Sequence, residues 1–230
     1  MGLSSWFRDL GVPWKISIGI LSGVAAVTSA YGLFTLYVNQ KSIDQKKKSD
    51  DRETAGDAAE KKVLVLGLEN SGKSTFLAAL AQHDSPVTSE REVSQPTQGF
   101  NVVCVSTGGV SLNVWEIGGK VQSYWPNFLS DVSVIVYVID SSASAKFTES
   151  KDALLAVLSE ESIKGIPLIL LACKQDVEGA RPRQEVESFF GLQELSANRK
   201  TGIVGVEVLS SGAVHGLEEA KELILKFCVE

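Results

Sequence analysis

The sequence predicts an α/β protein in which a six-stranded, mostly parallel sheet is covered by helices on both faces and follows an N-terminal transmembrane helix. Three observations lead to this expectation. Short apolar runs alternate with helical patterns after residue 61, a glycine-containing loop joins the first run to the first helical pattern, and a long uncharged segment lies near the N-terminus. Strands buried on both faces of a parallel sheet are apolar along their whole length.

Composition and charge limit the classes of protein to which the chain can belong. At 230 residues with 44% hydrophobic side chains, it can bury one core and carry one extension. The net charge of -6 argues against a nucleic-acid partner, which requires a surplus of Lys and Arg on one face. The 3 cysteines are widely spaced and lack a CxxC pair, so we expect neither a disulfide framework nor a zinc site. A reducing, cytosolic environment fits this pattern.

Residues 16–38 are 23 residues without a charged side chain. At a rise of about 1.5 Å per residue, such a helix spans roughly 34 Å, more than a hydrocarbon layer of about 30 Å. A buried core helix and a cleaved signal peptide are the alternatives, but the segment is longer than a usual signal core and no small-residue cleavage site precedes the next basic run. We therefore expect a membrane-spanning helix.

The basic residues around this span predict its orientation. Two precede it, whereas five follow it within residues 41–52. Positive residues favour the cytosolic side, so residues 1–15 should be a short non-cytosolic N-terminus. Residues 39–61 are too charged to bury a core and should form a flexible linker. The chain would be a single-pass membrane protein with its domain in the cytosol; an endomembrane and the mitochondrial outer membrane both remain open.

Residues 62–230 should form one domain around a single sheet. Apolar runs separated by helical patterns favour parallel pairing. The runs on either side of residues 107–109 are the exception, because so short a turn leaves no room for a crossover helix and predicts an antiparallel hairpin. The six expected strands lie at 63–67, 100–105, 111–116, 132–140, 166–172 and 205–210.

The loop GLENSGKS at 67–74 matches the phosphate-binding pattern GxxxxGK[ST] and lies between a strand pattern and a helix pattern, as that motif requires. Its glycines allow backbone N–H groups to point at phosphate oxygens beside a helix N-terminus. Lys73 should reach the β- and γ-phosphates, and the Ser74 hydroxyl should bind Mg²⁺. Kinases, ATPases and GTPases all remain open on this motif alone. The expected nucleotide-binding residues here are Gly67, Glu69, Asn70, Ser71, Gly72, Lys73, Ser74 and Thr75.

Four further segments resemble the Arf and Arf-like small GTPases: PTQGFN at 96–101, WEIGGK at 115–120, VIDSS at 138–142 and CKQD at 173–176. The resemblance covers roughly residues 62–230. It implies the P-loop small-GTPase fold and binding of GTP or GDP with Mg²⁺. It also implies protein effectors at switch I, switch II and the hairpin between them, and regulation by an exchange factor or a GTPase activator.

The resemblance assigns roles around the phosphates. Thr97 of switch I would meet Mg²⁺ and the γ-phosphate when GTP is bound, and Gly119 of switch II would donate its N–H to the γ-phosphate. Glu116 stands where the family has the Asp that holds Mg²⁺ through water. It keeps the charge and adds one methylene, so we expect a metal set of Ser74, Thr97 and Glu116 with weaker binding.

It also assigns the guanine contacts. Asp176 would accept hydrogen bonds from the base, and the stem of Lys174 would lie over it. Ser210 and Ser211 follow the last expected strand, where the family presents an N–H to guanine O6. Cys173 replaces the family's Asn, and because a thiol is a poor hydrogen-bonding group we expect weaker guanine affinity and faster exchange.

Lys120 occupies the position of the family's catalytic Gln, which orients the attacking water. That task needs a group that accepts as well as donates hydrogen bonds, and an ammonium only donates. We therefore expect a slow GTPase at most, with Lys120 stabilising the GTP state. Gln122 is the alternative source of the missing amide.

These features predict a membrane-anchored Arf-like switch, closest to a transmembrane member of the family. The second resemblance is to the β subunit of the signal-recognition-particle receptor, an Arf-like domain that follows a membrane span. The switch II sequence of that subunit differs from the WEIGG of this chain. A GTPase accelerated by a partner, a scaffold that no longer switches and a P-loop enzyme that does not use GTP remain as alternatives.

Overall fold

The computed structural model describes residues 60–83, 97, 99–107, 109–120, 122–209 and 213–229. The chain divides into two compact units, residues 1–57 and 58–230, and all described residues belong to the second unit. The predicted span at 16–38 and almost all of the predicted linker lie outside them. Within the described part of the chain, no helix has both the length and the apolar character of a membrane span.

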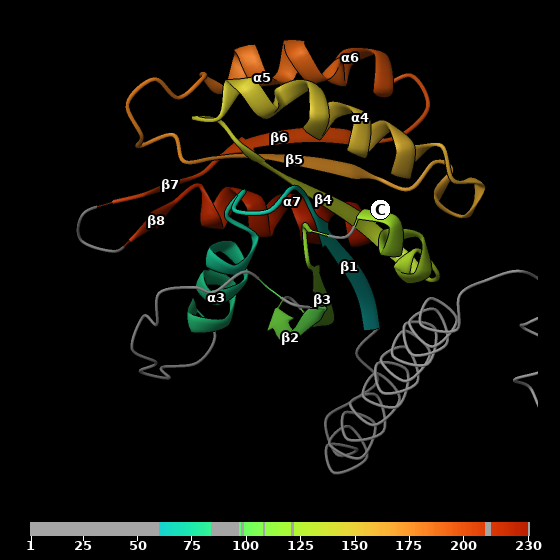
Figure 1. Ribbon diagram of the computed structural model, residues 1–230. Helices are drawn as coiled ribbons and strands as arrows, with labels where there is room; N and C mark the ends of the chain where they lie inside the picture. The colour runs from blue at the N-terminus through green and yellow to red at the C-terminus, as the bar shows by residue number, and fades with distance from the viewer. Residues whose placement is uncertain are drawn as a thin grey trace, which may run out of the picture. The chain divides into compact units, whose positions relative to one another are not determined.

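The second unit is built on a six-stranded sheet with the order β2-β3-β1-β4-β5-β6 (Figure 1). Neighbouring strands are parallel except β2 and β3, which form an antiparallel hairpin. The predicted sheet is therefore confirmed. The strands are β1 (Glu60–Leu66), β2 (Phe100–Thr107), β3 (Val110–Ile117), β4 (Val132–Asp140), β5 (Leu168–Cys173) and β6 (Thr201–Gly205).

The central strands are apolar because both faces of the sheet are covered. All six residues of β5 are buried, as are seven of the nine in β4. The hairpin turns at Gly109, whose φ of 76° lies in the left-handed region that glycine adopts readily. Thr107 consequently pairs with Val110 across the turn.

The position of the sixth strand differs from the expected 205–210. Strand β6 ends at Gly205, and the following residues form a separate two-stranded sheet of β7 (Glu207–Val208) and β8 (Val214–His215). Ile203 and Val204 are buried and belong to the main sheet, whereas Glu207 and Val208 are only partly buried. Apolar alternation alone does not separate the two strands, because both contain valines. The main sheet also begins at Glu60, inside the expected linker.

Helices cover both faces of the sheet, as expected (Figure 1). Phe76, Leu77 and Ile224 from two helices join strand residues in one core, and Leu154 and Phe190 are buried on the opposite side. The helices on the face that carries Phe76, Leu77 and Ile224 are α3 (Lys73–His83) and α7 (Leu217–Val229). The helices on the opposite face are α4 (Phe147–Leu158), α5 (Arg183–Phe190) and α6 (Leu192–Leu195). Short 3-10 helices are η1 (Gln122–Phe128), η2 (Ser144–Lys146) and η3 (Glu161–Ile163).

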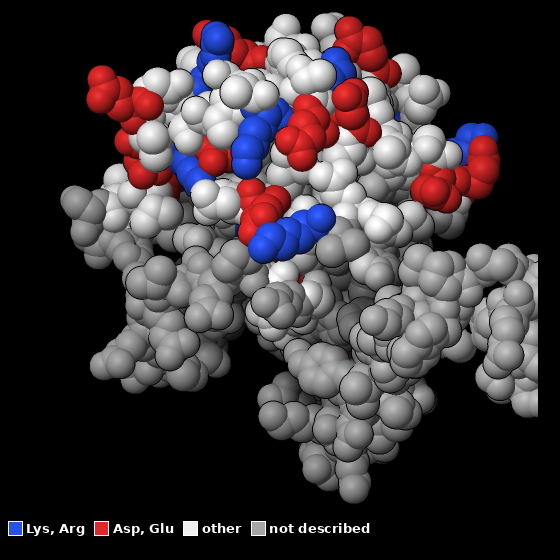
Figure 2. Space-filling view, viewed as in Figure 1, with Lys and Arg blue, Asp and Glu red and all other residues white. Residues whose placement is uncertain are grey.

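Strands β1, β3, β4 and β5 all run in the same direction, so their carboxyl ends meet at one edge of the sheet. In open α/β sheets this edge is the usual place for ligands. Acidic and basic side chains are interspersed on the described part of the face shown in Figure 2, without a broad basic area.

Candidate nucleotide-binding site

The loop after β1 has a backbone that only glycine accommodates at two points. Gly67 has a φ of 146°, and a Cβ on it would lie 2.3 Å from the carbonyl oxygen of Val138. Gly72 has a φ of 106°, also in the region that other residues avoid. The loop thus lies tightly against β4 and leads directly into the N-terminus of α3, a position that suits a phosphate group.

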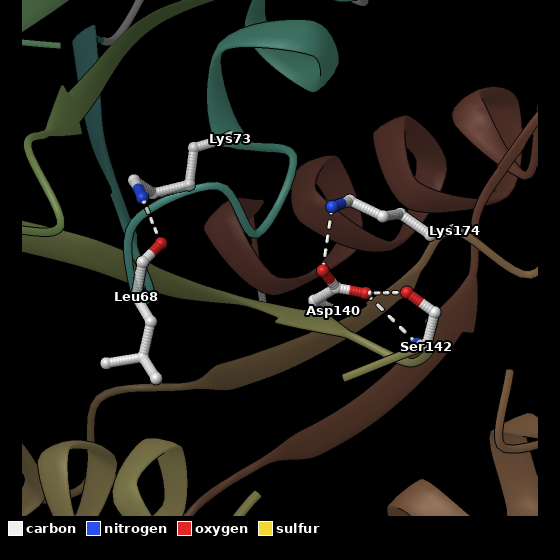
Figure 3. Close-up of polar contacts among 5 residues, drawn as sticks. All are labelled: Leu68, Lys73, Asp140, Ser142 and Lys174. Carbon is white, nitrogen blue, oxygen red and sulfur yellow. Dashed lines mark hydrogen bonds and ion pairs between the residues drawn. The ribbon is translucent and has the colours of Figure 1, made fainter. Parts of the chain in front are cut away.

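Lys73 lies at the first position of α3 and points back over this loop (Figure 3). Its Nζ donates hydrogen bonds to the carbonyl oxygens of Gly67 at 3.0 Å and Leu68 at 2.7 Å. Burial lowers the pKa of Lys73 to about 8, although Glu116 and Glu69 favour the charged form. The ammonium is therefore held inside the loop and still protonated at neutral pH.

Ser74, Thr97 and Glu116 meet beside Lys73, as the sequence predicts. The hydroxyls of Ser74 and Thr97 lie 3.1 Å apart, and both donate to Glu116 Oε1, the latter at 3.1 Å. Glu116 is 1% exposed, and its Oε2, like Ser71 Oγ, is a buried atom without a hydrogen-bond partner among the described residues.

Two hydroxyls and a buried carboxylate are oxygen ligands of the kind that Mg²⁺ prefers, and the orphaned Oε2 lacks a donor. The donor set therefore fits the ion that the motif implies. Ser74, Thr97 and Glu116 would hold it on the protein side. When bound, Mg²⁺ neutralises charge on the β- and γ-phosphates.

Switch II lies directly against the phosphate-binding loop. A Cβ on Gly119 would be 2.4 Å from the backbone N of Glu69 and 2.7 Å from the carbonyl oxygen of Gly67. Gly118 N donates to Gly99 O at 2.8 Å, and Trp125 Nε1 donates to Gly118 O at 3.2 Å. These contacts tie Gly99 of switch I and Trp125 of η1 to Gly118.

Lys120 projects from this segment toward the loop. Its Nζ lies 3.5 Å from Glu69 Oε1, an ion pair that sequence reasoning did not identify. The open groove that contains both side chains includes most of the phosphate and metal residues expected from the sequence, whereas Gln122 is not among its described lining residues. The groove is lined by Glu69, Asn70, Ser71, Gly72, Lys73, Ser74, Thr75, Thr97, Glu116, Gly119, Lys120 and Lys146.

Lys146 is the lining residue that the sequence analysis missed. It ends η2, after β4, where no motif marks it. Only the turn of the chain after β4 brings it to the groove.

At the end of β4, Asp140 accepts a hydrogen bond at Oδ2 from Lys174 Nζ, at 2.7 Å (Figure 3). Partial burial alone would raise the pKa of Asp140, but hydrogen bonds from Lys174 and Ser142 outweigh it and hold the pKa below its usual value.

Asp176, which we expect to bind the guanine base, follows β5. Its Oδ1 accepts a hydrogen bond from the backbone N of Val208, at 3.2 Å. Gln175 N donates to Val206 O in the same region, at 3.2 Å. The backbone that contacts Gln175 and Asp176 therefore belongs to the residues directly after β6. No sequence motif predicts these contacts. Ser210 and Ser211 lie outside the described residues.

Cys173 packs against the phosphate-binding loop at the position where the family motif has Asn. A Cβ on Gly72 would lie 3.4 Å from Cys173 Cβ and 3.7 Å from its Sγ, which is ordinary van der Waals contact. Burial raises the pKa of Cys173 to about 12, so the thiol stays protonated and is a weak hydrogen-bonding group.

An aromatic cluster lies where the β2–β3 hairpin meets the end of η1. Phe100 stacks on Trp115 with ring centroids 5.4 Å apart, and Phe128 lies 6.4 Å from Trp115. Lys62 places its Nζ 5.2 Å from the Trp115 ring and donates to the carbonyl oxygens of Phe128 and Ser130 at 2.8 and 2.9 Å. Trp115 and Phe128 are partly exposed, so the cluster faces solvent in part.

A model of the ADP-ribosylation factor family matches residues 49–227. The chain belongs to this family. ADP-ribosylation factor-like protein 3 of Chlamydomonas reinhardtii is 36% identical over 169 residues, covering 73% of this chain and 90% of the relative. ADP-ribosylation factor-like protein 2 of Arabidopsis thaliana is 33% identical over 162 residues, covering 69% and 84%.

A solved structure supports the same Arf-family fold. The Arl6 BBS3 small GTPase from Trypanosoma brucei, with the bound analogue GppNp, aligns with a TM-score of 0.62 at 24% identity, over 74% of this chain and 98% of that one. Arf-family GTPases bind GTP and GDP, with Mg²⁺ generally required. The chain is thus an Arf-like nucleotide-binding switch.

Proposed function

We propose that the chain is a membrane-anchored Arf-like switch that holds GTP and presents an effector surface, with little or no hydrolysis of its own. The observation that carries this proposal is Lys120. It stands at the position of the family's catalytic Gln and lies in the groove beside Glu69, 3.5 Å from Oε1.

The chemistry of Lys120 supports slow hydrolysis. Phosphoryl transfer depends almost entirely on positioning and charge stabilisation, and the attacking water needs a neighbour that accepts one of its protons in a hydrogen bond. An ammonium has three donors and no acceptor. Lys120 can stabilise negative charge on a phosphate but cannot orient the water as an amide does.

The effector surface would be the aromatic cluster of Phe100, Trp115 and Phe128. GTP with Mg²⁺ would draw in Thr97 and Gly119, which lie close in sequence to Phe100 and Trp115 respectively. Ordering of such segments by the γ-phosphate is a recurrent switching mechanism. Because Gly118 is hydrogen-bonded to Gly99 and Trp125, a change at the phosphate would reach both edges of the cluster.

The membrane anchor rests on residues 16–38. Their length, the basic residues that follow them and the wording WEIGG of switch II resemble the transmembrane ADP-ribosylation-factor-like protein ten. A permanent anchor means that GTP would not control recruitment to the membrane. Alkaline extraction of membranes tests this part, since the full chain should stay in the pellet and a chain without residues 16–38 should be released.

Single-turnover hydrolysis of radiolabelled GTP tests the switch proposal. The full chain should convert GTP slowly with or without added membrane extract, and Lys120→Gln should raise the rate by about tenfold or more, because one positioned hydrogen bond made in a transition state contributes on the order of 10²–10³ in catalytic rate. Equal rates for the two proteins would contradict the role given to Lys120. Protein that carries and binds no guanine nucleotide would contradict the switch.

A further inference from the structure

Glu69 and Lys120 form an ion pair between two segments that both contact the phosphate side of the groove. Glu69 is the third residue of the phosphate-binding loop, and Lys120 follows Gly119 of switch II. Their side chains are 38% and 63% exposed, and both line the groove that also contains Lys73. Exposed pairs of this kind contribute little stability, so their partners exchange readily.

The backbone places Lys120 at the loop, while its side chain remains free to turn. Gly119 packs so closely that a Cβ on it would lie 2.4 Å from Glu69 N. The next residue therefore starts beside the loop whichever way its side chain points. Lysine has a compact charge on a flexible stem with four carbons, so Nζ can change partners without backbone movement.

Lys73 has a different environment. It is 5% exposed and donates to the carbonyl oxygens of Gly67 and Leu68. A γ-phosphate would add negative charge beside Glu69, which repels it, and beside Lys120, which attracts it. Lys120 is the more exposed of the two lysines and already has a carboxylate as its partner.

We propose that Glu69 and Lys120 form an exchangeable ion pair that sets the preference of the groove for GTP over GDP. Lys120 pairs with Glu69 when GDP is bound and turns to the γ-phosphate when GTP is bound. Glu69 thereby weakens the GTP preference that Lys120 creates, and in the GDP state the pair keeps switch II against the loop. This inference rests on the proposed nucleotide switch and specifies how its phosphate end discriminates.

The test is equilibrium binding of fluorescent N-methylanthraniloyl GppNHp and GDP, with Mg²⁺, to the full chain purified in mild detergent. Lys120→Gln should weaken GppNHp binding about tenfold and GDP binding less than about twofold, since a single partly screened charge pair is at stake. Lys120→Arg should keep the GppNHp to GDP ratio near that of the wild type, because it keeps the charge.

Glu69→Gln should strengthen GppNHp binding about threefold when Lys120 is present, and clearly less in the Lys120→Gln background, because one exposed ion pair is released. The matched control is Lys164→Gln. Lys164 pairs with Glu161 at the same 3.5 Å, with side chains 78% and 85% exposed, near η3. This variant should leave both affinities unchanged.

A Lys120→Gln protein that loses GppNHp and GDP affinity equally, or loses neither, overturns the exchange while leaving nucleotide binding by the switch intact. Independent effects of Glu69→Gln and Lys120→Gln also overturn it, because an exchanging pair must be coupled. Wild-type protein that binds neither probe overturns the switch itself and this inference with it.

Discussion

Gly119→Ala is the sharpest perturbation of the site, because the added methyl group meets backbone atoms. The new Cβ would lie 2.4 Å from Glu69 N, 2.4 Å from Leu68 C and 2.7 Å from Gly67 O, all well inside van der Waals contact. The phosphate-binding loop is continuous with β1, whose residues Val63–Leu66 are 0% exposed. We expect switch II to yield rather than the loop.

The expected cost follows from the hydrogen bond that moves away. If the Gly119 N–H serves the γ-phosphate, displacement removes one hydrogen bond to a charged group, about 1.5–3 kcal/mol. That range corresponds to roughly 10- to 150-fold weaker GppNHp binding. GDP has no γ-phosphate and therefore never makes the hydrogen bond from Gly119 N–H. The affinity for GDP should consequently change by less than about twofold.

Isothermal titration of both nucleotides into wild-type and variant protein measures this difference. Gly205→Ala is the matched control, because a Cβ there would meet Gln175 Cγ at 3.7 Å and Arg183 Cβ at 4.0 Å, which is ordinary contact. It should leave both affinities unchanged. Equal weakening of GDP and GppNHp by Gly119→Ala, or no weakening, would refute the argument.

Three other predictions concern the same nucleotide-binding site. Glu116→Gln keeps the shape of a side chain that is 1% exposed but removes its charge, so half-maximal GppNHp binding should need about tenfold more Mg²⁺; an unchanged magnesium titration would exclude Glu116 from the metal site. Cys173→Asn restores the amide of the family motif beside Gly72, and release of fluorescent GDP in stopped flow should slow by about fivefold for one added hydrogen bond; equal or faster release would show that the thiol is not what weakens guanine binding. Lys73 must be protonated to bind phosphate, and burial gives it a pKa of about 8. The ammonium is present below that pH and lost above it, so GDP affinity should fall by up to about tenfold per pH unit above pH 8. The GDP affinity of Lys73→Arg should not change over the same pH range. A wild-type affinity that does not change with pH would contradict the lowered pKa.

Local sequence rules were sufficient for most of the sheet and for the phosphate end of the site. The apolar runs of β4 and β5 require burial on both faces, and the short turn at Gly109 requires an antiparallel hairpin. The loop at 67–74 needs glycines for its backbone path, so its position could be recognised from residue types alone. The sixth strand was misplaced because valines on either side of Gly205 have the same local preference in two different sheets.

By itself, the sequence determined the order of strands and helices, the phosphate-binding loop and the residue types offered to a nucleotide. Tertiary structure decided which of those residues meet. The ion pair of Glu69 with Lys120, the contact of Val208 with Asp176 and the arrival of Lys146 at the groove all join segments distant in the chain. No local preference specifies such pairs, since they exist only because parallel strands bring their carboxyl ends to one edge of the sheet.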